Sequence, residues 1–156
     1  MRTVYEIDVL GTFALCQLAG HFMLRQRQGT IALVSSLHGR MTYPQRVPYA
    51  TAKAALGGLA RALAVEWGCQ GIRVNTLLPW QVESLRTQRF IDTAAQHGED
   101  LREAYTRRSP MRQLAAAEDI AATILWLART PSVTGQEIVL DCGVSASMWY
   151  KNYANE

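Results

Sequence analysis

The sequence has few cysteines, and their placement excludes two kinds of stabilising site. Cys16, Cys69 and Cys142 are odd in number, far apart and never part of a Cys-x-x-Cys pair. A disulfide framework or a structural zinc site needs clusters that this pattern lacks. His21 and His97 likewise have no partner at the spacing of metal ligands. We therefore expect buried free thiols, no metal site and a location in the reducing cytoplasm.

Long apolar runs and stripes of one charge are also missing. No uninterrupted apolar run reaches the ~18 residues that a membrane span needs. Glu6 and Asp8 lie where the apolar part of a signal peptide would begin. The net charge is only +3, and the basic residues are scattered or form short clusters such as Arg107-Arg108. We expect neither membrane insertion nor nucleic-acid binding.

Hydrophobic periodicity divides the chain into helices and strands. Apolar residues at spacings of three and four predict helices at 3–27, 49–69 and 118–129, and one or two polar helices within 84–108. Short apolar runs without alternation predict strands covered on both faces at 30–35, 72–78 and 136–141. In the first helix, the expected apolar face consists of Ile7, Leu10, Ala14, Leu18 and Phe22.

The order of these elements predicts an α/β fold. Helices that alternate with buried strands indicate a parallel sheet flanked by helices, with right-handed crossovers. Ligands of such sheets bind beyond the carboxyl ends of the strands. No linker or internal repeat divides the 156 residues, so we expect one domain.

Tyr49 and Lys53 start the second long helix, four residues apart and therefore on one face. A free tyrosine has a pKa of about 10, too high for a base at neutral pH. A nearby ammonium favours the phenolate, and the positive end of the helix adds to this. Ser36 ends the preceding strand, where its hydroxyl could meet a substrate oxygen. The residues indicate a tyrosine acid/base, a lysine that tunes it and a serine that orients a carbonyl or alcohol.

Most Tyr-x-x-x-Lys pairs on helices are solvated surface neighbours, so the pair alone is weak evidence. Its surroundings are more specific, because several further segments resemble the short-chain dehydrogenase/reductase family in order and spacing. They are Ile31-Ala-Leu-Val-Ser-Ser-Leu-His-Gly39, Tyr49-Ala-Thr-Ala-Lys-Ala-Ala-Leu56, Leu63-Ala-Val-Glu66, Gly71-Ile-Arg-Val-Asn75 with Pro79, and Val133-Thr-Gly-Gln-Glu-Ile-Val-Leu-Asp-Cys-Gly143. The resemblance extends from Tyr5 to Ser147. It implies a nicotinamide-dependent oxidoreductase.

The resemblance assigns roles to four catalytic positions. The family serine lies about thirteen residues before its tyrosine, which selects Ser36 rather than Ser35, while Tyr49 and Lys53 match the tyrosine and lysine. The family lysine also bonds the nicotinamide ribose. The fourth member is usually an asparagine three residues before a glycine, and here Asp8 holds that position. Asp8 could alter the proton relay through Lys53, or could simply be a solvated residue of the helix surface.

The same resemblance implies cofactor contacts after the second strand. The family usually has Pro-Gly-x-x-x-Thr there, and this chain has Pro79, Trp80, Val82 and Ser84 at the corresponding positions. The backbone of Val82 would meet the carboxamide, and Ser84 would replace the threonine. Trp80 departs from the family glycine; it could narrow the substrate pocket or stack near the ring, or be a core aromatic. The cofactor would be NAD or NADP.

The family's N-terminal β-α-β portion, with its Gly-x-x-x-Gly-x-Gly turn, has no counterpart in this sequence. We therefore expect the C-terminal half of a doubly wound Rossmann-type sheet. One hypothesis is a piece of a complete oxidoreductase, which would act as a homo-oligomer with contacts near the aromatic tail of Trp149, Tyr150 and Tyr153. The alternative is a shortened, catalytically inactive interaction subunit that docks on a full-length relative. Three catalytic residues together favour the first.

Overall fold

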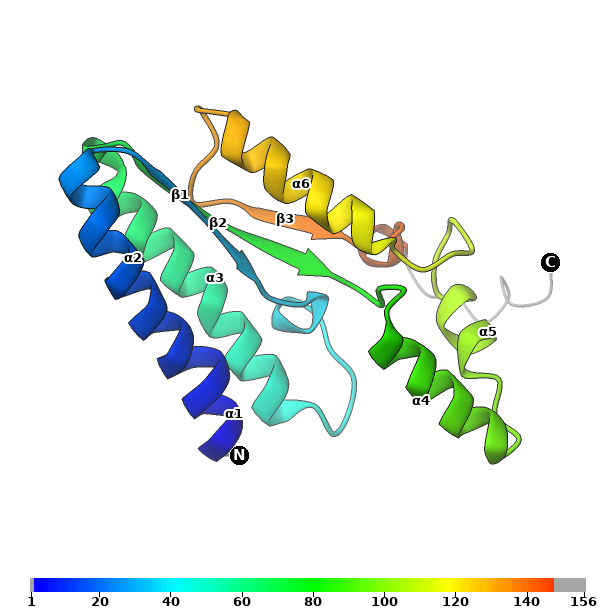
Figure 1. The fold of residues 1–156 in the computed structure, drawn as a ribbon. Coiled ribbons are helices and arrows are strands. Elements are labelled where there is room, and N and C mark those ends of the chain that lie inside the picture. The colour runs from blue at the N-terminus through cyan, green and yellow to red at the C-terminus, as the bar shows by residue number, and fades with distance from the viewer. Residues whose placement is uncertain (1, 148–156) are drawn as a thin grey trace.

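Three parallel strands form the centre of the fold in the order β1-β2-β3 (Figure 1). They are β1 (Gly29–Val34), β2 (Ile72–Pro79) and β3 (Glu137–Leu140). The computed structural model describes residues 2–147, so the aromatic tail predicted at subunit contacts lies outside the described part. The middle strand is buried at every position except Arg73, which is half-buried. The parallel sheet of an α/β fold is confirmed.

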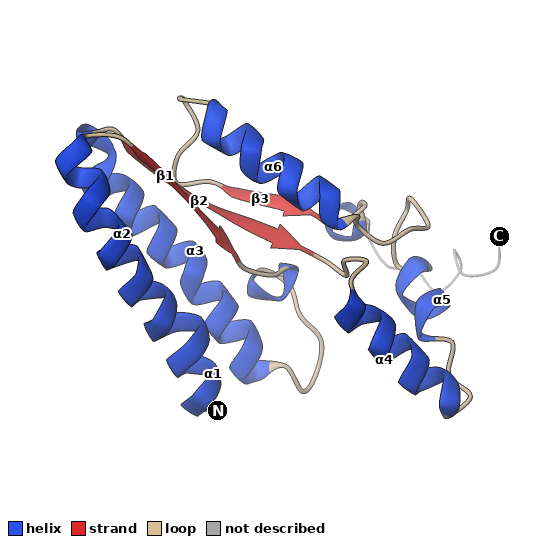
Figure 2. Ribbon diagram, viewed as in Figure 1, coloured by secondary structure: helices blue, strands red, loops and turns tan. Residues whose placement is uncertain are grey.

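Helices cover both faces of this sheet (Figure 2). A continuous helix made of α1 (Arg2–Tyr5), a π-helical turn η1 (Glu6–Gly11) and α2 (Thr12–Gln26) lies on one face with α3 (Val47–Trp67). On the other face lies α6 (Ala117–Arg129). Beyond the carboxyl ends of the strands are α4 (Leu85–Gln96) and α5 (Leu101–Thr106). Short 3-10 turns complete the chain: η2 (Leu37–Gly39), η3 (Gly68–Gln70) and η4 (Val144–Ala146).

Two polar side chains of β2 hold the sheet to its surroundings. Asn75 is fully buried; its amide donates to the carbonyl of Val133 at 2.9 Å and its oxygen accepts from the N–H of Gln136 at 3.0 Å. The Arg73 guanidinium donates to carbonyl oxygens at the end of α6, including that of Thr130 at 2.7 Å. The Arg73 bonds satisfy carbonyl groups that the end of helix α6 leaves without partners. The Arg-Val-Asn segment is therefore structural here.

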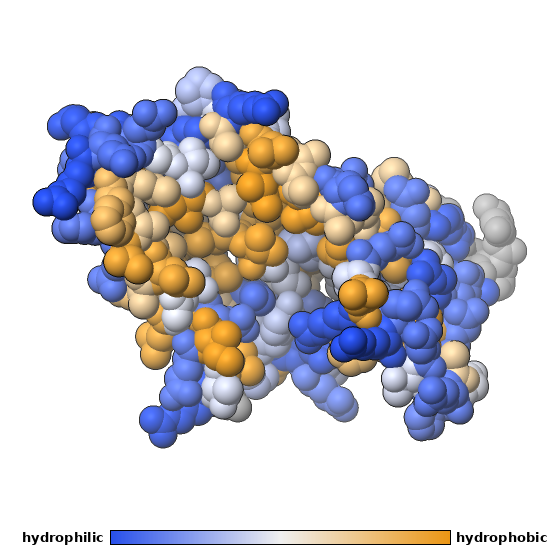
Figure 3. Space-filling model, in the orientation of Figure 1, coloured by the Kyte–Doolittle hydropathy of each residue, from blue (hydrophilic) through white to orange (hydrophobic). Residues whose placement is uncertain are grey.

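The first helix carries its predicted apolar face on the outside of the described part of the molecule. Its expected apolar face does not pack against the described part of the molecule: Ile7 is 67% exposed, Leu10 60%, Leu18 61% and Phe22 57%. The side that packs inward instead contains Cys16 and Gly20. Hydrophobic residues consequently gather on the surface over α2 and α6, whereas the region of α4 and α5 is mostly hydrophilic (Figure 3).

One helix resembles a membrane span in its length and composition. The helix from Arg2 to Gln26 has a mean hydropathy of 1.4 over its most apolar window and is long enough for a span by length and composition alone. That is weak evidence, because the core helix of a soluble protein and an N-terminal signal sequence pass the same test. Only 11% of the window is buried within the described residues, and Cys16 is the apolar side chain through which the helix joins the core of Leu33 and Trp67.

Cysteines follow the sequence-based expectation only in part. All three are free thiols, but Cys16 is the buried one, Cys69 is exposed and Cys142 is half-buried. Burial raises the pKa of the Cys16 thiol above its ordinary value, which keeps this side chain protonated in the core.

Candidate active site

The two neighbouring serines at the carboxyl end of β1 form different hydrogen bonds. The Ser35 hydroxyl donates to the backbone carbonyl of Lys53 at 2.7 Å, so it ties the strand to α3. The Ser36 oxygen accepts from the N–H of His38 at 3.2 Å, as the cap of η2, and retains its own proton for another partner. Both serines are buried. The geometry thus leaves the Ser36 hydroxyl for a substrate and gives Ser35 a structural bond.

Tyr49 and Lys53 lie one turn apart at the start of α3, as predicted. The Lys53 ammonium is 5.7 Å from the centre of the Tyr49 ring. It also donates to the Asp8 carboxylate at 3.1 Å, and the two side chains of this ion pair are only 14% and 26% exposed. Asp8 is therefore not a solvated surface residue. It lies against Lys53 although 45 residues separate the two in sequence.

Asp8 reaches Lys53 from an irregular part of its helix. The segment Glu6–Gly11 forms a π-helical turn between α1 and α2. Such turns widen a helix locally and are frequent at functional sites, because they re-aim one side chain. The turn contacts α3 and lies beside the helix start that carries Tyr49. No sequence signal for this turn was identified.

The predicted cofactor residues follow β2. Pro79 is the last residue of the strand and pairs with Leu140 of β3. The N–H of Trp80 donates to the carbonyl of Leu140 at 3.0 Å, and its backbone does not adopt the left-handed region. Replacing the family glycine with tryptophan is thus compatible with the local backbone.

Val82 and Ser84 differ in how much of their bonding capacity is used. Val82 pairs with Ala115 in an isolated parallel bridge whose two bonds use the carbonyl of Gln81 and the N–H of Glu83. The N–H and carbonyl of Val82 itself take no part in that bridge. The Ser84 oxygen accepts from the N–H of Thr87 at 3.1 Å, so it caps α4. Val82 can accept a further partner more readily than Ser84.

His38 and its neighbours form an aromatic cluster that sequence reasoning missed. His38 follows Ser36 closely in the sequence, where it could contact a substrate or be solvated like most loop histidines; in the structure it is 8% exposed. Its ring lies 4.7 Å from that of Tyr43, 5.6 Å from Trp80 and 5.7 Å from Tyr49. Burial lowers the pKa of His38, and the nearby Arg46 lowers it further, so the ring is neutral at pH 7. The spacing of these aromatic residues along the sequence does not indicate the cluster, because the cluster joins the ends of two different strands.

The end of β3 carries a well-satisfied carboxylate. Asp141 accepts from the N–H of Gly143 at 2.9 Å and from that of Ser145 at 2.6 Å. Burial alone would raise the pKa of Asp141, but hydrogen bonds from Ser145 and from the backbone outweigh it and hold the pKa below the ordinary value. Cys142 follows with φ of 53°, in the left-handed region that favours glycine.

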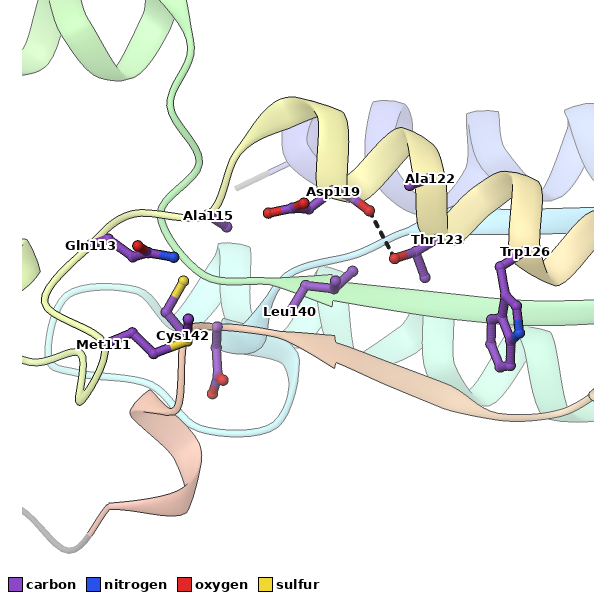
Figure 4. Close-up of a pocket in the computed structure, with 10 residues that line it drawn as sticks. Met111, Gln113, Ala115, Asp119, Ala122, Thr123, Trp126, Leu140 and Cys142 are labelled. Atoms are coloured by element: carbon purple, nitrogen blue, oxygen red, sulfur yellow. Dashed lines mark hydrogen bonds between the residues drawn. The ribbon is translucent and has the colours of Figure 1, made fainter.

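A separate hollow of about 450 Å³ lies between α6 and the end of β3 (Figure 4). Helix α6 lines it with Asp119, Thr123 and Trp126, and the strand end contributes Leu140 and Cys142. None of the predicted catalytic residues borders it. Within residues 2–147, no group of three His, Cys, Asp or Glu side chains is placed to hold a metal ion. The chemistry therefore points to the carboxyl end of β1 and the start of α3.

Known proteins match nearly the whole chain. A family model described as enoyl-(acyl carrier protein) reductase matches residues 1–145. The chain is 35% identical to 3beta-hydroxysteroid dehydrogenase 1 of Eggerthella lenta over 92% of its own length and 54% of that protein. It is 33% identical to a 3-oxoacyl-[acyl-carrier-protein] reductase of Thermotoga maritima, over 90% and 55%. The structure of ElxO with NADP bound superposes with a TM-score of 0.82 at 28% identity, over 90% and 56%.

These matches establish two facts. The chain belongs to the short-chain dehydrogenase/reductase family of oxidoreductases, as its motifs predicted. It also spans about half the length of the curated relatives it matches. The Rossmann-type architecture of the structural neighbours confirms the predicted fold class.

Proposed function

We propose that this chain carries the catalytic residues of an NAD(P)-dependent oxidoreductase that transfers a hydride between nicotinamide and a carbonyl or secondary alcohol. One observation carries the proposal: Lys53 lies between the Tyr49 ring and the Asp8 carboxylate, in a partly buried position beside the strand end that bears Ser36. A surface Tyr-x-x-x-Lys pair would not need a partly buried carboxylate partner or a neighbouring serine with a spare proton.

Each side chain has a distinct role in the proposed reaction. During reduction, the Tyr49 hydroxyl gives a proton to the substrate oxygen, and during oxidation it takes that proton back. Ser36 donates a hydrogen bond to the same oxygen and stabilises the charge that develops there. Lys53 stabilises the phenolate electrostatically, and Asp8 holds the ammonium group in place. The nicotinamide cofactor supplies the hydride chemistry when bound.

Several described residues fit such a cofactor. A lysine ammonium has three N–H donors. Within residues 2–147 the Lys53 ammonium donates only to Asp8, so donors remain for ribose hydroxyls. The N–H and carbonyl of Val82, which take no part in its bridge to Ala115, suit a carboxamide, which needs one donor and one acceptor. Pro79 and Trp80 would shape the wall beside the ring. We assign Ser84 a smaller part, because its oxygen already caps α4.

Whole-protein properties extend this proposal. ElxO binds NADP, and we propose NAD or NADP for this chain because its nicotinamide-side residues fit either. We further propose a homo-oligomer in the cytoplasm, consistent with three free thiols. The exposed apolar stripe of α2 supports the alternative of an inactive interaction subunit, since a docking protein would cover it.

Kinetics of the protein, expressed at the full length that its gene encodes, test the proposal. Consumption of NADH or NADPH is followed with a panel of ketones and aldehydes. We expect Tyr49→Phe to reduce turnover by ~10²-fold or more, because the acid/base group is lost. Tyr5→Phe is the control, since it removes a phenol that bonds Thr51 outside the proposed site. Near-normal turnover by Tyr49→Phe would overturn the assignment. A wild-type protein that oxidises neither cofactor but binds a full-length relative would favour the interaction subunit.

A further inference from the structure

The aromatic cluster beside Tyr49 exceeds what proton transfer requires. Its rings come from four segments: His38 from η2, Tyr43 from the following loop, Tyr49 from α3 and Trp80 from the loop after β2. Tyr43 and Trp80 also meet edge-on at 6.4 Å. The cluster starts at the proposed acid/base and extends away from it, so it can line the path of a substrate chain.

Two arginines converge on the far end of this cluster. The guanidinium carbon of Arg46 lies 5.2 Å from the centre of the Tyr43 ring, and that of Arg108 lies 5.9 Å from it. Arg46 precedes α3 and Arg108 follows α5, so two segments distant in sequence meet here. Tyr105 of α5 lies at the same place: burial and Tyr43 raise its pKa, while Arg46 and Arg108 oppose the rise.

Neither guanidinium has a carboxylate partner within residues 2–147. The ion pairs of this part of the chain use other cations, including the two arginines close to Arg108 in sequence; the cations are Arg2, Lys53, Arg61, Arg102 and Arg107. Two uncompensated guanidinium groups near one ring create a positive potential that attracts an anion. Their planar donors match a carboxylate well.

The cluster also holds a polar group without a partner. The Trp80 indole N–H is buried and has no acceptor among the described residues. A buried donor normally finds one, and leaving it without an acceptor costs stability. An oxygen of a bound ligand would supply it. The arginine pair indicates that a negatively charged molecule fits here, and the indole N–H indicates a nearby oxygen acceptor.

We propose that the substrate is an oxo acid or the corresponding hydroxy acid, with its carboxylate held by Arg46 and Arg108. Its apolar stem lies among His38, Tyr43 and Trp80, and its carbonyl lies at Ser36 and Tyr49. This proposal rests on the proposed oxidoreductase function. In reduction, the carbonyl carbon gains a hydride from the reduced nicotinamide and the oxygen gains the Tyr49 proton, so a hydroxy acid and oxidised nicotinamide result.

A matched pair of probes tests the carboxylate assignment. Benzoylpropionate has a ketone, an aromatic group and a carboxylate, and its methyl ester lacks only the charge. On the holoenzyme at full encoded length, kcat/KM is measured for both probes, and calorimetry measures their binding. We expect Arg46→Gln and Arg108→Gln each to lower kcat/KM for the acid by about 10-fold, mainly through a higher KM, as for a lost charged hydrogen bond. Neither variant should affect the ester. Arg129→Gln, at the end of α6, is the charge-matched control.

The outcomes distinguish the carboxylate site from the proposed oxidoreductase function on which it rests. A preference for the acid that disappears in both arginine variants, but not in Arg129→Gln, supports the carboxylate site. Equal turnover of acid and ester in all variants would overturn that site and leave the oxidoreductase function standing. Binding of benzoylpropionate that depends on the arginines without any oxidation of NADPH or NADH would keep the anion site but overturn its role as a substrate site.

Discussion

Helices α2 and α3 cover the same face of the sheet, and both repeat apolar residues at helical spacing, yet only α3 buries its stripe (Figure 1). In α3, Leu56 is 2% exposed and Leu63 5%. In α2, Leu18 is 61% exposed. The helices approach closely at Gly20, where an added Cβ would collide with the Trp67 ring. The inner side of α2 therefore needs a small residue rather than a large apolar one.

Periodicity thus identifies an apolar face but does not say what covers it. The stripe of α3 faces β2, which the chain itself contains. The stripe of α2 faces no described element, and the chain spans about half the length of its curated relatives. The chain itself therefore covers the apolar stripe of α3, which carries Tyr49 and Lys53. The apolar stripe of α2 is instead an exposed surface suited to packing against another segment or molecule.

Truncating one leucine in each helix should give the largest contrast. We expect Leu63→Ala to lower the free energy of unfolding by ~2–5 kcal/mol, because it removes buried methyl groups and leaves a cavity. Leu18→Ala should change it by less than about 0.5 kcal/mol, as for an exposed position. Urea denaturation measures both. A large loss for Leu18→Ala would break the comparison and show that another segment or molecule covers α2.

Removing Asp8 tests how much its ion pair with Lys53 stabilises the protein. We expect Asp8→Ala to lower the free energy of unfolding by ~1–3 kcal/mol, because it leaves the partly buried Lys53 ammonium without its partner. Glu6→Ala breaks the neighbouring pair with Arg2, whose side chains are 49% and 92% exposed, and should have little effect. Denaturation curves of both variants at one ionic strength give the comparison. Equal effects would mean that the Asp8 pair is no more than a surface contact.

Cys142→Gly should have the smallest effect and the opposite sign. Glycine adopts the left-handed conformation of this position without the penalty that a Cβ brings, so we expect a gain of about 1 kcal/mol in stability. Cys69→Gly serves as the control, because Cys69 is exposed and its backbone is outside the left-handed region. Thermal unfolding of the two variants shows the difference. A loss of stability in Cys142→Gly would indicate that the thiol makes a contact worth more than the backbone strain.

Much of the candidate site was accessible from local sequence. Tyr49 and Lys53 share a helix face because four residues separate them, and Ser36 ends a strand that an apolar run reveals. Asn75 has a structural role, because its two bonds tie β2 to the segment before β3. The burial of His38 and the exposure of the Ile7–Phe22 stripe do not follow from local sequence, since both depend on neighbours distant in sequence.

The sequence by itself determined the order of helices and strands, the parallel α/β class and the family, because these follow from periodicity and short motifs. Only the tertiary structure decided that Asp8 pairs with Lys53, that His38 joins Tyr43, Tyr49 and Trp80, and that Arg46 and Arg108 meet. Those contacts join different elements, and they form where the carboxyl ends of parallel strands bring separate loops together. Local pattern sets each element, whereas packing sets which side chains face one another.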